Sequence, residues 1–103
     1  MRTFDERERA YEAKFALDQD RLFAIRARRD RLVGLWAAGI LRLPEAEAET
    51  YAQSNVQAGL AGTSGQGVLA RLTQDLTGYA TEAQIAERMA DYLVQAAEDP
   101  EAA

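Results

Sequence analysis

The stretch that decides the fold is TFDERERAYEAKFALDQDRLFAIRARRDRLVGLW, residues 3–36. Charged residues dominate it, yet apolar side chains recur at steps of three, four or seven residues: Phe4, Tyr11, Phe15, Leu22, Ile25, Leu32 and Trp36. This spacing is typical of one face of an α-helix. A helix so long and so charged cannot bury its whole length in a chain of 103 residues. We therefore expect part of it to contact a partner.

One point inside this stretch is suited to a new helix start. Asp18 can act as an N-cap, so residues 3–17 either continue the long helix or form a separate arm. Thr3 and Glu6 form a capping box that favours a helix start at the beginning of the stretch. Gly34 and Gly39 predict close packing of a second helix near Trp36, which we expect in the core.

The rest of the chain predicts three more helices. Pro44 marks a corner before a helix over 45–60, and a glycine-rich connector, 59–67, precedes a helix over 67–77. Gly78 is suited to the end of that helix, and Thr81 with Gln84 forms a second capping box before the last one. The predicted buried faces are Tyr51, Ala52, Val56 and Leu60; Val68, Leu69, Leu72 and Leu76; and Ile85, Met89, Tyr92, Leu93 and Ala96.

No stretch has the composition and alternation of a strand. The predicted fold is all-α, a four-helix bundle with an N-terminal arm that is either helical or mobile. We expect the arm to span residues 1–18, the bundle residues 19–98, and a disordered tail residues 99–103.

Composition excludes several kinds of site. The chain has neither cysteine nor histidine, so it lacks disulfides, thiolate metal sites and the commonest general acid–base group. No signal peptide or long apolar run is present, so we expect a cytoplasmic protein with no direct membrane insertion. The net charge of −5 is uneven: residues 1–31 carry nine basic and seven acidic side chains, and residues 32–103 carry three and ten.

The charged groups give no sign of catalysis. Glu8 with Glu12, and Glu45 with Glu49, stand one helical turn apart on surfaces that we expect to be solvated, whereas acid–base catalysis requires a buried carboxyl with a shifted pKa. No enzyme and no metal are therefore predicted. The glycine connector lacks the lysine of a phosphate-binding loop.

The basic run 26–31 is interrupted by an acid, and the acidic body would repel a polyanion, so no nucleic acid is expected. We expect the stems of these arginines to cover the edge of the core and their guanidinium groups to stay in water. The aromatic residues Phe4, Tyr11 and Phe15 are either core residues or anchors for a groove on a partner.

Two blocks of sequence resemble a known family. FDERERAYEAKFA at 4–16 and ARRDRLVGLWAA at 27–38 are similar to the zeta subunits, small inhibitors of the alphaproteobacterial F-type ATP synthase. The resemblance is close over residues 3–41 and looser beyond them. The connector at 59–67 departs from it, because relatives tend to be acidic there.

The resemblance implies a regulatory inhibitor that blocks ATP hydrolysis by inserting its N-terminal helix into the catalytic head of the synthase. It implies no resident cofactor, although some members bind adenine nucleotide weakly. We expect a free monomer that becomes peripheral to the inner membrane through the synthase. The candidate partner contacts are Phe4, Arg7, Tyr11, Lys14 and Phe15. The alternative is a small ligand-sensing or scaffolding module that acts through its bundle, with the arm folded onto it.

Overall fold

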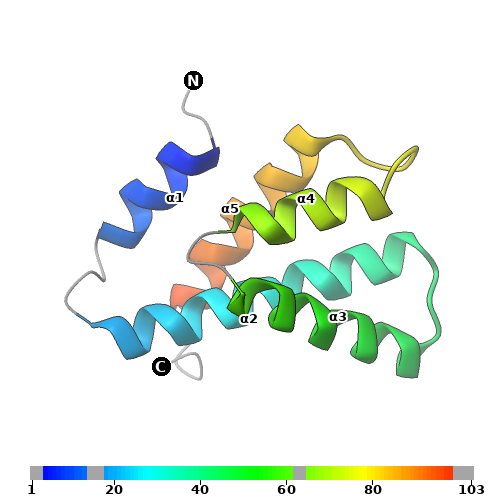
Figure 1. The fold of residues 1–103 in the computed structure, drawn as a ribbon, viewed down its shortest axis with the longest axis horizontal. Coiled ribbons are helices and arrows are strands. Elements are labelled where there is room, and N and C mark those ends of the chain that lie inside the picture. The colour runs from blue at the N-terminus through cyan, green and yellow to red at the C-terminus, as the bar shows by residue number, and fades with distance from the viewer. Residues whose placement is uncertain (1–3, 14–17, 62–64, 99–103) are drawn as a thin grey trace.

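A computed structural model describes residues 4–13, 18–61 and 65–98 of the chain. They form the helices α1 (Phe4–Glu12), α2 (Gln19–Ile40), α3 (Glu45–Leu60), α4 (Gln66–Asp75) and α5 (Glu82–Glu98), with no strand among them (Figure 1). The predicted all-α fold is confirmed. The Thr3 side of the first capping box and the predicted tail at 99–103 lie outside the described residues.

The predicted helix ends are largely correct. Asp18 caps α2, since its side chain accepts a hydrogen bond from the Arg21 amide over 2.9 Å. α1 is therefore a helix separate from α2, and the arm does not continue the long helix. The second capping box is also confirmed: the Thr81 amide donates to the Gln84 side chain over 2.9 Å, and the Gln84 amide donates to the Thr81 hydroxyl over 3.1 Å. Gly78 has a φ of 87°, a conformation that favours glycine.

The hydrophobic core lies between α2, α4 and α5. Its fully buried members are Val33, Ala37, Val68, Leu69, Leu72, Leu76, Ile85, Ala86 and Met89, and a second cluster joins Ile25 to Leu93, Ala96 and Ala97. The predicted buried face of the α4 region is confirmed, and that of α5 is confirmed except for Tyr92, which is only partly buried. The prediction for α3 is less accurate, because Asn55 is buried there while Leu60 is 47% exposed.

α2 is the central helix and contacts both α3 and α5. The prediction for Gly34 is confirmed: a Cβ at this position would lie 2.9 Å from the Ala52 Cα, so only glycine allows α3 to come so close. The same prediction for Gly39 is wrong, since a Cβ there would meet no atom of another element within 4 Å.

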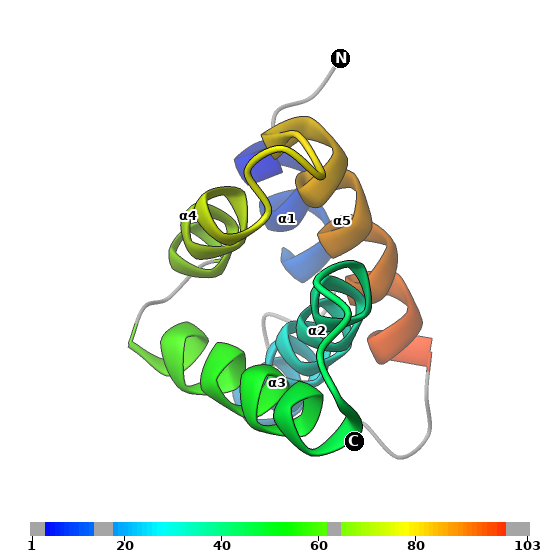
Figure 2. The same ribbon diagram turned by 90° about the vertical axis from the view of Figure 1, so that its right-hand side faces the viewer.

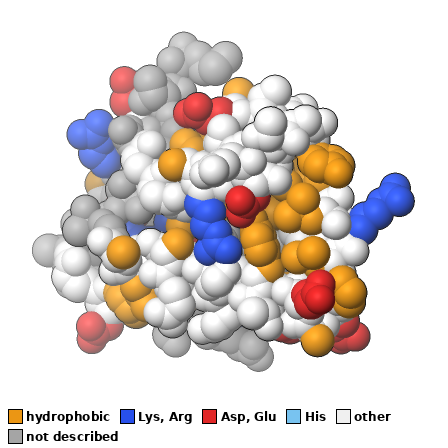
Figure 3. All heavy atoms as spheres, turned by 45° about the vertical axis from the view of Figure 1, so that its right-hand side comes forward, with side chains coloured by type: hydrophobic (Ala, Val, Ile, Leu, Met, Phe, Trp, Pro, Cys, Tyr) orange, Lys and Arg blue, Asp and Glu red, His pale blue; other side chains and the backbone are white. Residues whose placement is uncertain are grey.

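Trp36, which the sequence places in the core, is partly buried and packs against the core cluster from its edge. The guanidinium carbon of Arg88 lies 5.6 Å from the centre of the Trp36 ring. Trp36, Ile40 and the exposed Tyr79 line a shallow groove between the end of α2 and the start of α5. Figure 3 shows hydrophobic side chains gathered on the surface beside acidic and basic ones. No helix among the described residues is long and apolar enough to cross a membrane.

Candidate functional site

The arm helix α1 lies against the body of the protein. It contacts α5, and Figure 2 shows it flanked by α4 and α5. Of the predicted partner contacts, Arg7 is placed: its Nη1 atom lies 2.9 Å from Oε2 of Glu87 on α5. Lys14 and Phe15 lie outside the described residues, as do the side chains of Phe4 and Tyr11.

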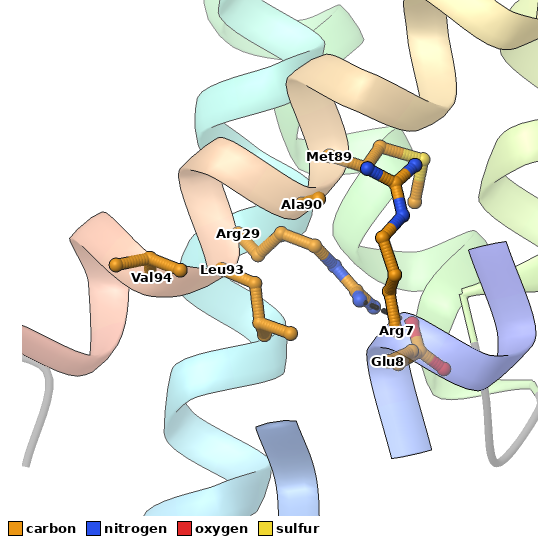
Figure 4. Close-up of a pocket in the computed structure, with 7 residues that line it drawn as sticks. All are labelled: Arg7, Glu8, Arg29, Met89, Ala90, Leu93 and Val94. Carbon is orange, nitrogen blue, oxygen red and sulfur yellow. Dashed lines mark hydrogen bonds and ion pairs between the residues drawn. The ribbon is translucent and has the colours of Figure 1, made fainter. Parts of the chain in front are cut away.

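A buried ion pair joins α1 to α2. Nη1 of Arg29 donates to Oε2 of Glu8 over 2.6 Å, and Nε of Arg29 donates to Oδ1 of Asp30 over 2.9 Å. The side chains of Arg29, Glu8 and Asp30 are only 2%, 3% and 4% exposed. Figure 4 shows the Arg29 side chain pointing at Glu8 beneath α5. One guanidinium thus lies between two carboxylates with almost no access to water.

Glu8 also contacts the start of α4. The backbone amide of Gly65, the N-cap residue of α4, lies 3.1 Å from Oε1 and 3.2 Å from Oε2 of Glu8. The first amides of a helix have no partner within the helix, and its dipole makes this end positive. The Glu8 carboxylate therefore accepts a hydrogen bond from an amide at the start of α4. This one side chain connects α1, α2 and α4.

A second ion pair lies one turn further along α1. Nη2 of Arg26 donates to Oε2 of Glu12 over 2.6 Å, and Nε of Arg26 donates to the other carboxylate oxygen. This hydrogen bond raises the pKa of the Arg26 guanidinium. Because Glu8 pairs with Arg29 and Glu12 with Arg26, α1 and α2 run in opposite directions along this contact. We call Glu8, Glu12, Arg26, Arg29 and Asp30 the α1 ion-pair cluster.

Asp30 lies on the α3 side of the cluster. Burial raises the pKa of its carboxyl to about 6, although the neighbouring Arg29 acts to lower it. The Asn55 side chain donates to the Asp30 carbonyl oxygen over 3.1 Å. A Cβ at Gly59 would overlap the Asp30 carboxylate, lying 3.0 Å from its Cγ atom. The sequence pattern places Gly59 where the predicted helix over 45–60 and the connector overlap; it lies inside α3 and leaves room for this carboxylate.

A cavity of about 170 Å³ opens between α1 and α5. Its lining combines the apolar residues Met89, Ala90, Leu93 and Val94 with Arg7, Glu8 and Arg29 (Figure 4). Pockets that enclose a drug-sized ligand usually have a volume of at least about 300 Å³, so this cavity is smaller than such a pocket. Both arginines already have carboxylate partners. Within the described ranges, no group of three or more acidic side chains could hold a metal ion.

The structure corrects two expectations about these charges. Glu8 and Glu12 are buried, not solvated, because they face arginines of α2. Arg29 is buried together with its guanidinium group, which does not stay in water. Sequence reasoning also missed Asp30, a buried carboxyl with a raised pKa, although it does not line the cavity. The only trace of the cluster in the sequence is a spacing, with carboxylates at i and i+4 in one helix and arginines at i and i+3 in the next, and this spacing does not say that the two helices pack together.

One comparison with known proteins gives a match. The model of the family described as ATPase inhibitor subunit zeta matches residues 1–99, nearly the whole chain. Neither the curated proteins nor the solved structures contain a significant match.

Proposed function

This chain belongs to the ATPase inhibitor subunit zeta family, and we propose that it blocks ATP hydrolysis by inserting the helix that begins at Phe4 into the catalytic head of an F-type ATP synthase. Membership of the family implies an interaction with the synthase and a regulatory role. Insertion of the N-terminal helix is supported by the fact that α1 is a helix distinct from α2. This helix ends before Asp18 caps α2, so it can move without unwinding the core helix.

The nature of the α1 contact also supports insertion. Three described side chains of α1, Arg7, Glu8 and Glu12, pair with the body through ion pairs and hydrogen bonds. Water can replace such contacts when the helix leaves, whereas exposing an apolar face would be unfavourable. The remaining four helices retain their own hydrophobic core.

We assign the partner contacts to the predicted residues Phe4, Arg7, Tyr11, Lys14 and Phe15. Large aromatic side chains supply much of the binding energy at interfaces, and charged ones mainly raise the association rate. The proposal includes a monomer when free, a cytoplasmic location, and attachment to the inner membrane only through the synthase.

The test is ATP hydrolysis by synthase depleted of its own zeta subunit, with the full-length protein and with a variant that lacks residues 1–16. We expect the full-length protein to inhibit and the deletion to raise the half-inhibiting concentration at least tenfold. The deleted protein should remain helical by circular dichroism, with a lower melting temperature because Arg26 and Arg29 lose their glutamate partners Glu12 and Glu8. The exposed substitution Glu47→Gln serves as the control. Full inhibition by the deleted protein would contradict insertion.

The alternative is a ligand-sensing module that acts through the bundle. The docked position of α1 supports this alternative, because the arm is folded onto the body. A ligand would be expected in the cavity between α1 and α5. Weak adenine nucleotide binding stays a prediction. Titration of the free protein with ATP, followed by NMR, tests it; shifts confined to residues around this cavity would support the alternative.

A further inference from the structure

We propose that the α1 ion-pair cluster holds the free protein in a self-restrained state, so that α1 must leave the body before it can inhibit. This inference rests on the proposed function and concerns the regulation of the same helix. Its basis is the pairing of two carboxylates of α1, Glu8 and Glu12, with two guanidinium groups of α2, Arg29 and Arg26.

The docked and inserted positions of α1 exclude each other. In the docked position the Glu8 side chain is only 3% exposed, and it is held by α2 and by the first amide of α4. A helix inserted between subunits of another protein would need to present its sides to those subunits. α1 cannot be enclosed by its own body and by a partner at the same time.

The chemistry of the cluster makes the docked position specific but reversible. Removing one member leaves a buried charge without a partner, which is strongly unfavourable. Moving the whole of α1 away is different, because Glu8, Glu12 and the two guanidinium groups all return to water. The attraction within a buried ion pair and the hydration of its separated ions nearly balance. The cluster therefore selects one docked position without making release of the helix prohibitively unfavourable.

The restraint has a predictable effect on inhibition. A protein whose binding-competent state is only partly populated binds its partner more weakly, in proportion to that population. Weakening the cluster from the side of the body should therefore strengthen inhibition. A change on α2 leaves the sequence of α1 intact, so it alters release without altering what α1 presents to the partner.

The first experiment compares Arg26→Met with Arg31→Met in the ATP hydrolysis assay. Both residues lie on α2 and pair with a glutamate, but Arg31 pairs with Glu49 of α3 at the surface and not with α1. We expect Arg26→Met to lower the half-inhibiting concentration about fivefold and Arg31→Met to leave it unchanged. Circular dichroism checks that both are folded. Equal potency of the two folded variants would overturn the proposal.

The second experiment fixes α1 in place and does not depend on weakening the fold. The chain has no cysteine, so Arg7→Cys with Glu87→Cys introduces the only two thiols, at positions whose side chains meet across α1 and α5. A short bis-maleimide reagent with a disulfide in its spacer joins the two thiols, and a reductant then cleaves the disulfide of the spacer and separates the helices again. We expect the joined protein to lose inhibition and the cleaved protein to regain it.

The comparison is made within one variant, so any effect of replacing Arg7 is the same in both forms. Equal inhibition before and after cleavage would overturn the self-restrained state while leaving the proposed function intact. Absence of inhibition by the wild-type protein would instead show that the proposed function is wrong, and this inference would fail with it.

Discussion

Two buried regions of this protein are held together by different forces. Between α2, α4 and α5, the buried side chains are aliphatic, with Val33, Leu72, Ile85 and Met89 fully enclosed. Between α1 and the body, the described ion pairs are buried too: Glu8 and Arg29, with Asp30 beside them, are almost as inaccessible to water. Equal burial therefore hides a difference in how each contact responds when it is opened.

The two contacts differ in what water does to their side chains once they are separated. Opening the aliphatic core exposes apolar surface to water, which is unfavourable by about 25 cal/mol per Å². Opening the ionic contact returns Glu8, Glu12 and their two guanidinium partners to water, so much of the loss is recovered. The core should thus resist separation in proportion to its area, whereas the ionic contact should be sensitive to any change that leaves its charges unequal.

The largest effect should follow from removing the central cation. Arg29→Met leaves Glu8 and Asp30 buried without the cation that both of them contact, which should lower the free energy of unfolding by about 3–5 kcal/mol. Urea unfolding followed by circular dichroism measures it. Adding Glu8→Gln should recover part of the loss, because one uncompensated anion is removed. Wild-type stability of Arg29→Met would show that the cluster is not enclosed.

A comparable loss should arise in the aliphatic core, but no charge change should rescue it. Leu72→Ala removes a fully buried side chain and should cost about 2–5 kcal/mol. The same unfolding measurement applies, with Glu8→Gln added as before. If Glu8→Gln recovered stability in Leu72→Ala as well as in Arg29→Met, the two regions would not be energetically distinct.

A smaller effect should appear as a pH dependence. The pKa of Asp30 is raised to about 6, so the folded state favours the protonated carboxyl. This stabilisation is fully present below the ordinary pKa near 4 and is lost as the pH rises through 6. Between pH 5 and 7.5, the wild type should lose about 1 kcal/mol relative to Asp30→Asn. Charges of Arg29, Arg26 and Glu8 are common to both proteins. Parallel stability curves would refute the raised pKa.

The smallest effect should come from the exposed pair at the edge of the contact. Arg7 and Glu87 have side chains 33% and 64% exposed, so solvent screens their attraction. Arg7→Gln should lower the free energy of unfolding by about 0.2–1 kcal/mol, measured in low salt, and by less in high salt. A loss as large as that of Arg29→Met would place Arg7 among the buried charges.

Much of the fold could be predicted because its signals are local. Asp18, Thr81 and Gln84 act through neighbouring amides, and the apolar faces of the α4 region and α5 repeat with the helical period. The buried face of α3 is less predictable from the hydrophobic pattern, because its close contact with α2 is made through small residues such as Ala52 and Gly59. The hydrophobic pattern alone favoured Leu60, which is exposed.

The α1 ion-pair cluster could not be predicted with the same reasoning. A glutamate at the surface and a buried one look alike in sequence, and only the antiparallel position of α1 and α2 brings Glu8 to Arg29. Charged residues are rarely buried without a partner, so the default expectation for a charge-rich helix is solvation. Of the five predicted partner contacts, Arg7 is placed, and its pairing with Glu87 did not follow from the spacing.

The hydrogen bonds between Glu8 and the Gly65 amide have a consequence for the order of events during synthesis. They join residues 57 positions apart, whereas Arg29 follows Glu8 by only 21 positions. As the chain leaves the ribosome, Glu8 can meet Arg29 well before the first amide of α4 exists. Glu8 thus acquires its second partner only after the start of α4 has been made, and Arg7 meets Glu87 only once α5 has followed, so a nascent chain can hold α1 through fewer contacts than the finished protein does.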